Sequence, residues 1–266
     1  MAIGLIIVGD EILSGKREDK HMSRVIALLK ERGMQLDWVE YIGDNRERIT
    51  ATLKRSFASG DIVFSTGGIG ATPDDHTRQC AAAALGVAIE LHPEAKELIQ
   101  ERMRDMARER GEQVDLNSPD QLQRLKMGEF PAGADLIPNP FNKIPGFSIR
   151  NHFFVPGFPV MAWPMLEWVL DTHFSHLFHQ QPQYEKSVLV YELAESTATP
   201  LMELLEADYP LIKVFSLPSV GSETERRHIE LGVKGDEQQV AIAYEKMLEG
   251  LLQLKAEFIP TPARTA

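Results

Sequence analysis

Cysteine is nearly absent from this sequence of 266 residues, which contains only Cys80. A single thiol excludes an internal disulfide and a cysteine-cluster metal site, and it fits a reducing compartment. No apolar run reaches the roughly 18 residues that a membrane span needs, and the first residues lack the basic segment and cleavage site of a signal peptide. We therefore expect a cytoplasmic protein that does not enter a membrane.

Clusters of basic residues are also missing. The formal net charge is -11, and an extended nucleic-acid footprint needs a basic face, so nucleic acid is not an expected partner. A small phosphorylated ligand remains compatible with this charge, because backbone N–H groups and a metal ion can hold it. The sequence contains neither a Gly-x-Ser-x-Gly elbow nor a His-Glu-x-x-His motif, which gives no support to the hydrolases that use them.

What the sequence does contain is an alternation of strand and helix patterns. Continuous apolar runs are typical of buried parallel strands, and such strands are predicted at 3–8, 36–42, 61–65 and 153–155. Helical spacing and capping residues predict helices from residue 22, from Asp44, at 74–85, at 93–110 and after Pro159. This alternation implies βαβ units and an α/β fold with a mostly parallel sheet.

A second pattern follows the best linker candidate, residues 180–183. It has the order βαββα, with strands predicted at 187–193, 211–216 and 227–233 and helices at 200–207 and 236–254. Thr199 is the predicted N-cap of the first of these helices and Pro200 its first residue. We therefore expect two domains, 1–178 and a small α+β domain at 184–258, with an irregular stretch at 111–150.

The strongest candidate for a site is the glycine-rich segment from Ser65 to Thr77, between a strand and a helix. Glycines let the backbone approach a phosphate, and the following helix offers N–H groups and the positive end of its dipole. The alternative is a tight turn with an Asp or Thr cap. The candidate phosphate contacts are Thr66, Gly67, Gly68, Gly70, Thr72, Asp74 and Thr77.

A second candidate loop, 9–15, follows the first strand and would open at the same edge of a parallel sheet. Glu11 or Ser14 can contact a ligand or a metal there, although a helix-capping loop is the alternative. The candidate ligand contacts of this loop are Gly9, Asp10, Ser14 and Gly15.

Asp44 follows another predicted strand. It can serve simply as an N-cap, with Glu47 completing a capping box. It can also pair with Asp75 to hold a hard cation against a diphosphate. The turn at 156–159 can wall such a pocket with Pro156, Gly157 and Pro159, or it can be only a rigid strand-helix turn.

Three histidines, His173, His176 and His179, are spaced three apart and could bind a metal from one helix. A solvated helix end is the usual place for such residues. His76 can touch a phosphate or act as a cap, and Cys80 is expected to be a small buried hydrophobe.

The motifs at 9–15, 66–77 and 156–159 resemble, in the same order, the N-terminal region of the CinA family. That region is similar to the molybdopterin-binding MoaB/Mog domains, so the resemblance implies a three-layer α/β fold. Residues 186–255 also resemble the small middle domain of CinA. The chain differs at Ala71, where the family usually has Pro, and at Lys20-His21, where it usually has Thr-Asn. The family's deamidase domain has no counterpart before Ala266, so deamidase activity is not implied.

The resemblance implies two alternative functions. One is a metal-dependent pyrophosphatase that splits ADP-ribose or FAD-like dinucleotides into AMP and a second phosphate product. There, Asp44 and Asp75 would hold Mg²⁺, Mn²⁺ or Co²⁺, and Glu11 or Asp10 would orient a water. The other is a pterin-binding or adenylyl-handling module without turnover. Relatives commonly assemble, so a homo-oligomer is expected.

Overall fold

The computed structural model describes residues 2–113, 115–180, 184–222 and 226–261. The chain divides into two compact units, one formed by residues up to 29 and 35–177 and the other by residues 30–34 and 178 onward. Of the predicted linker, residues 181–183 lie outside the described part. None of the helices in the described ranges is long and apolar enough to span a membrane.

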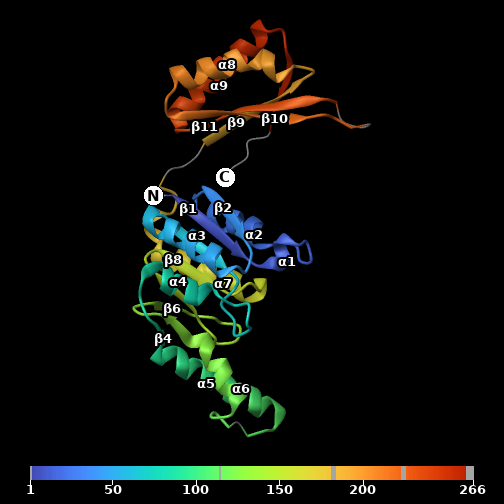
Figure 1. Ribbon diagram of the computed structural model, residues 1–266. Coiled ribbons are helices and arrows are strands. Elements are labelled where there is room, and N and C mark those ends of the chain that lie inside the picture. Colours follow the sequence, from blue (N-terminus) through green and yellow to red (C-terminus); the bar gives the residue numbers. More distant parts are fainter. Residues whose placement is uncertain (1, 114, 181–183, 223–225, 262–266) are drawn as a thin grey trace. The chain divides into compact units, whose positions relative to one another are not determined.

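The first unit is built on a six-stranded sheet with the order β2-β1-β3-β8-β7-β6 (Figure 1). Its parallel strands are β1 (Ile3–Val8), β2 (Trp38–Ile42), β3 (Ile62–Thr66) and β8 (His152–Val155). The antiparallel strands β7 (Gly146–Ile149) and β6 (Asp135–Ile137) extend one side. The prediction of a mostly parallel sheet is therefore confirmed.

Helices lie on both faces of this sheet and give the three predicted layers. On one face, Ile49 of α3 (Arg46–Ser59) and Ala81 of α4 (Thr77–Leu85) share a core with Phe154. The neighbouring Phe153 points to the other face, where its ring packs edge-on against Phe174 at the end of α7 (Pro159–His173). Helix α2 (His21–Lys30) is joined to α7 by an ion pair between Arg24 and Glu167.

Residues 111–150 are more regular than predicted. They contain α6 (Pro119–Leu125), the turn η1 (Lys126–Gly128), β5 (Glu129–Pro131), β6 and β7. Strand β5 pairs with β4 (Ile89–Leu91), just before the long helix α5 (Pro93–Arg110). These short strands pair with distant segments and bury Phe130 and Phe147, whose rings stack 4.9 Å apart. Their formation depends on tertiary pairing rather than on a local pattern.

Several predicted helix boundaries were wrong. Residues Asp10–Leu13 form one helical turn, α1, where a loop was predicted. Helix α3 is capped by Asn45, whose side chain accepts the Arg48 N–H at 2.9 Å, and not by Asp44. Helix α4 begins only at Thr77. Asp44 and Asp75 are therefore loop residues that cap no helix.

The three spaced histidines do not share a helix face. Helix α7 ends at His173, the turn η2 (Ser175–Leu177) contains His176, and His179 has a left-handed φ of 51°. Within the described ranges, no group of three or more His, Cys, Asp or Glu residues is arranged to hold a metal. The idea of a histidine metal site is therefore wrong.

The second unit is an antiparallel sheet with the order β10-β11-β9-β12. It contains the predicted βαββα order as β9 (Tyr184–Tyr191), α8 (Glu195–Asp208), β10 (Ile212–Ser219), β11 (His228–Gly235) and α9 (Glu237–Gln253), followed by β12 (Glu257–Pro260). Helix α8 begins at Glu195, so Thr199 is not its N-cap. Instead, the Thr199 hydroxyl donates to the Glu195 carbonyl one turn earlier.

Candidate functional site

Four loops meet at the carboxyl ends of the parallel strands. The loop after β1 bonds to the loop after β2, through Asp10 and Asp44. Arg46 follows the loop after β2, and its Nε donates to Nδ1 of His76 at 3.1 Å. This hydrogen bond connects the loop after β2 to the loop after β3. The Gly67 N–H donates to the Val155 carbonyl at 3.1 Å, which connects the loop after β3 to the end of β8. The sequence segments 9–15, 43–46, 66–77 and 156–159 therefore form one region.

The glycine loop after β3 has a conformation that only glycine fits. Gly67 has φ 96°, and a Cβ there would lie 2.2 Å from the backbone oxygen of Val8. Gly68 has φ 68°, and a Cβ there would lie 2.2 Å from Thr77 Oγ1. The fully buried Thr77 closes the loop, because its hydroxyl donates to the Gly67 carbonyl and its N–H to the Gly68 carbonyl. These residues fix the backbone and leave no room for a side chain.

This closure leaves a set of polar groups without partners. Among the described residues, the backbone N–H groups of Gly68, Ile69 and Gly70 donate to no other group. The hydroxyls of Ser65 and Thr66, at the end of β3, are buried and also have no partner there. Consecutive N–H groups in such a turn form a concave site for an anion. The three N–H groups are therefore available to an anion such as a phosphate or a carboxylate.

The two acids of this loop face different neighbours. One oxygen of Asp75 accepts hydrogen bonds from the N–H and the hydroxyl of Thr72, at 2.9 and 2.5 Å. Asp74 accepts from the same hydroxyl at 2.5 Å, and this bond lowers its pKa. The charge of Asp74 also acts on Asp44. One oxygen of Asp75 thus holds Thr72 in the loop, and the charge of Asp74 reaches Asp44 in the neighbouring loop.

Asp10 and Asp44 join the loop after β1 to the loop after β2 through two mutual hydrogen bonds. The Asp10 N–H donates to the Asp44 carboxylate at 2.9 Å, and the Asp44 N–H donates to the Asp10 carboxylate at 3.2 Å. Gly43 makes this possible, because a Cβ there would lie 2.2 Å from the Asp10 carboxylate. Burial raises the pKa of Asp44, and the charges of Asp10, Glu11 and Asp74 raise it further, against the lowering effect of the Asp10 N–H. A cation placed beside Asp44 would relieve this repulsion.

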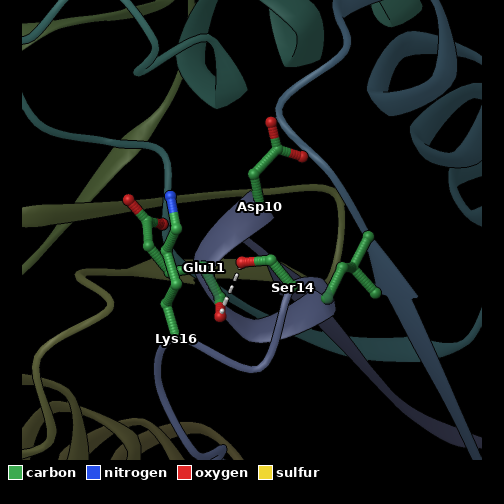
Figure 2. Close-up of a pocket in the computed structure, with 5 residues that line it drawn as sticks. Asp10, Glu11, Ser14 and Lys16 are labelled. Carbon is green, nitrogen blue, oxygen red and sulfur yellow. Dashed lines mark hydrogen bonds between the residues drawn. The ribbon is translucent and has the colours of Figure 1, made fainter.

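A pocket of about 440 Å³ lies beside Asp10, one of these two acids (Figure 2). It is lined by Asp10, Glu11, Leu13, Ser14 and Lys16. Ser14 turns its hydroxyl back to the Glu11 carbonyl, whereas Lys16 forms no ion pair with any described residue. Gly9 and Gly15 do not line the pocket but allow the turns on either side of α1, with φ 156° and 72°. The pocket therefore combines two acids with one unpaired cation.

The turn at 156–159 packs closely against the glycine loop. A Cβ on Gly157 would lie 3.4 Å from the Cα of Gly67, so little more than one methyl group would fit between the two glycines. Pro156 precedes this contact, and Pro159 begins α7. The Gly157 carbonyl is bonded to Nε2 of His21 at 3.0 Å. The turn therefore forms a wall beside the glycine loop.

Sequence reasoning missed Arg78 and Lys16. Arg78 follows Thr77 and is 2% exposed, and its guanidinium donates to the Gly70 carbonyl. Burial lowers its pKa, while the charges of Glu129 and Asp75 raise it. A lone arginine in an alanine-rich helix gives no local sign of burial, so only the fold reveals this contact. Lys16 follows the second motif immediately and could have been found by extending that motif by one residue.

The comparisons with known proteins identify the family of the first unit. A family model described as a probable molybdopterin binding domain matches residues 4–176. The chain belongs to this molybdopterin binding domain family. A CinA-like protein of Anaeromyxobacter dehalogenans is 31% identical over 64% of the chain, and one of Anaeromyxobacter sp. strain Fw109-5 is 31% identical over 88%. The resemblance to the CinA N-terminal region is thus confirmed.

The chain matches only part of the length of these relatives, and the similar solved structure supports only the fold. The chain spans 40% of the length of the first CinA-like relative and 58% of the second. The crystal structure of a CinA protein of Thermoplasma acidophilum, of unknown function, has a TM-score of 0.55 and 24% identity, covering 64% of this chain and 98% of that one. At this identity the likeness supports the fold alone. The family match therefore identifies the module that residues 4–176 form.

Proposed function

We propose that the first unit binds the diphosphate of an ADP-ribose-like or FAD-like dinucleotide and hydrolyses it to AMP and a second phosphate product. The observation that carries this proposal is the run of N–H groups at Gly68, Ile69 and Gly70, which have no partner among the described residues. They follow in the chain the hydroxyls of Ser65 and Thr66, which also lack a described partner. These groups lie at the carboxyl ends of parallel strands, where open α/β sheets bind their ligands. They can hold phosphate oxygens in a protein of net charge -11 without a basic patch.

The proposed hydrolysis uses a metal ion that the substrate would help to hold. Asp44 and Asp75 each use one carboxylate oxygen in a hydrogen bond, and the second oxygen of each has no described partner. Mg²⁺ commonly uses one or two carboxylates and takes its other ligands from phosphates and water. Asp44 and Asp75 would hold such an ion, and Mn²⁺ or Co²⁺ would serve equally in this proposal. When bound, the ion would neutralise charge that develops on the phosphate oxygens.

The remaining chemistry comes from side chains and backbone. The N–H groups of the glycine loop, with Thr66 and Thr72 at its ends, hold the diphosphate in place and stabilise charge on its oxygens. Glu11 orients the attacking water from the pocket beside α1, because the Asp10 carboxylate is already bonded to the Asp44 N–H at 3.2 Å. Asp74 and Thr77 contribute indirectly, by shaping the loop and its charge.

The test is incubation of the protein with ADP-ribose or FAD in the presence of Mg²⁺, Mn²⁺ or Co²⁺, followed by product analysis. The proposal predicts AMP release that stops when the metal is chelated. Equal release from a protein carrying Asp44→Asn and Asp75→Asn together would identify a contaminating hydrolase. Absence of AMP with every metal would contradict the proposal.

A second candidate follows from the family's description. The matched family is a probable molybdopterin binding domain, and the same loop would hold the phosphate of a pterin without turnover. Adding molybdopterin to the same assay separates the two candidates. Tight pterin binding with no product from any dinucleotide would favour the binding module.

A further inference from the structure

Helix α2 and the residues before it contact the turn at 156–159, here called the wall turn, and helix α7 after it. They do so through three side chains, Arg17, His21 and Arg24, which we call the clasp. The Arg17 guanidinium lies over the Phe158 ring, 5.6 Å from its centroid. His21 bonds to the Gly157 carbonyl. Arg24 pairs with Glu167 and lies 5.8 Å from the centroid of a Trp163 ring. The wall turn is thus held at two points, and α7 is held at a third.

His21 is the buried member of the clasp. It is 4% exposed, and its Nε2 lies 3.0 Å from the Gly157 carbonyl oxygen. A carbonyl can only accept, so Nε2 must carry the proton. The other ring nitrogen, Nδ1, is buried and has no partner in the described part of the chain. A buried acceptor without a partner costs stability, so packing alone would favour an apolar residue here.

The His21 bond acts on the glycine loop through one intermediate residue. Gly157 faces Gly67 so closely that a Cβ added to Gly157 would already be in van der Waals contact with the Gly67 Cα, at 3.4 Å. Gly67 itself is held by the Val155 carbonyl on one side and by the Thr77 hydroxyl on the other. A shift of the Gly157 carbonyl would therefore reach the turn that presents the free N–H groups.

The position of His21 in the helix is also fixed independently of its ring. Asp19 accepts the N–H groups of His21 at 2.8 Å and of Met22 at 3.2 Å, and it accepts the Tyr41 hydroxyl at 2.8 Å. Burial and the bond to Asp19 raise the pKa of Tyr41 to about 12. A substitution at His21 therefore removes the ring contact without removing the cap of α2.

We propose that His21 is a positioning residue of the ligand site, which holds the wall turn against the glycine loop by donating a hydrogen bond to Gly157. The part of this inference that concerns ligand affinity rests on the proposed function. The part that concerns the clasp does not, because it can be measured without any ligand.

The test compares His21→Gln with His21→Met and uses AMP as the probe. Glutamine can place an amide N–H near the position of Nε2, whereas methionine has similar length and no donor. In His21→Met we expect the hydrogen-exchange protection of the Gly67 amide to fall about tenfold and the Kd for AMP to rise about tenfold. His21→Gln should stay close to the natural protein in both measurements. The neighbouring exposed Lys20, changed to Met, is the control and should change neither.

The outcomes separate the possible failures. The Val63 amide, bonded to the Asn151 carbonyl at 2.9 Å, reports on the sheet away from the clasp. If His21→Met lowers protection equally at Val63 and Gly67, His21 only stabilises the core and the proposal is wrong. It is also wrong if Gly67 protection is unchanged, or if it falls while AMP affinity stays the same. If the natural protein binds no AMP, the proposed function fails, and the exchange data alone decide the role of the clasp.

Discussion

The two units of the chain differ in whether the buried hydroxyl groups of their sheets are hydrogen-bonded. In the first unit, the parallel strands β1, β2, β3 and β8 all end at one edge of the sheet. The buried hydroxyls of Ser65 and Thr66 at this edge have no partner in the described part of the chain. In the second unit, neighbouring strands alternate in direction. Its buried Ser187 hydroxyl donates to Glu230 at 2.8 Å.

This difference shows where a site can form. A parallel sheet collects several loops at one edge, and each loop adds groups that a ligand can satisfy. An antiparallel sheet distributes its turns over both ends, and its polar side chains can satisfy one another across strands. We therefore assign ligand binding to the first unit and expect the second to carry no catalysis.

The largest effect should come from changing Gly67 to alanine. Its φ of 96° and the 2.2 Å approach to the Val8 oxygen leave no room for a methyl group. We expect the free energy of unfolding to fall by about 2–5 kcal/mol, with loss of ligand binding. Gly60→Ala is the matched control, because Gly60 has φ 75° but nothing within 4 Å of its Cβ position.

Urea unfolding of the two variants tests this step. Gly60→Ala should lose only the cost of a left-handed alanine, about 1 kcal/mol. If both variants lose the same free energy of unfolding and Gly67→Ala still binds AMP, the close packing of the glycine loop is unimportant. That result would contradict the contrast drawn between the two units.

Changing Asp75 to asparagine should separate a metal ligand from a loop residue. Asparagine can still accept the Thr72 N–H, so the fold should be retained. A neutral amide replaces a carboxylate poorly at a metal, so we expect turnover to fall by about a hundredfold or more. Thermal unfolding and dinucleotide hydrolysis measured together on this variant and on Asp74→Asn check this. Turnover at the natural rate across a metal titration would make Asp75 structural.

The pH dependence of stability should reveal the buried His152, which lies at the first residue of β8, whereas the site follows the last residue of that strand. Burial lowers the pKa of His152 to about 4, although its bond to the Arg150 carbonyl opposes this. The unfolded chain, with a pKa near 6.5, takes up the proton first, so stability is lost as the pH falls from 6.5 towards 4. We expect this loss to reach up to about 3 kcal/mol.

The matched variant is His152→Gln, which has no titrating group and can still bond to the Ser56 hydroxyl, now 2.9 Å from His152 Nε2. Urea unfolding of both proteins at several pH values should show a steeper acid loss in the natural protein. Parallel curves would contradict the assigned pKa. Ligand affinity should not follow this titration, because His152 lies at the opposite end of its strand from the site.

The smallest effect should come from removing residues 179–266, which make up most of the second unit. A chain ending at residue 178 keeps the whole parallel sheet and all four loops, so turnover at saturating substrate should be retained. The cut removes the contact between Gly33 and His179, whose side chain lies 2.7 Å from the Gly33 Cβ position. A truncated protein that stays folded, keeps its oligomeric state and loses all turnover would contradict a non-catalytic role for residues 187–255.

The sequence predicted the framework better than the details of the site. Apolar runs such as 3–8 predicted the parallel strands, because strands buried on both faces have a clear local signature. Strands β5, β6 and β7 were missed, since they are short and depend on distant pairing. The mutual bonds of Asp10 and Asp44 could not be predicted either, because two acids on separate loops become neighbours only when the sheet forms.

The most direct test of the central claim is a nuclear magnetic resonance titration of the protein with AMP and, separately, with adenosine. If the glycine loop binds phosphate through its free N–H groups, AMP should shift the amide signals of Gly68, Ile69 and Gly70 strongly, while adenosine should leave them nearly unchanged. Equal shifts with both compounds, or shifts confined to other residues, would contradict the assignment of the phosphate site.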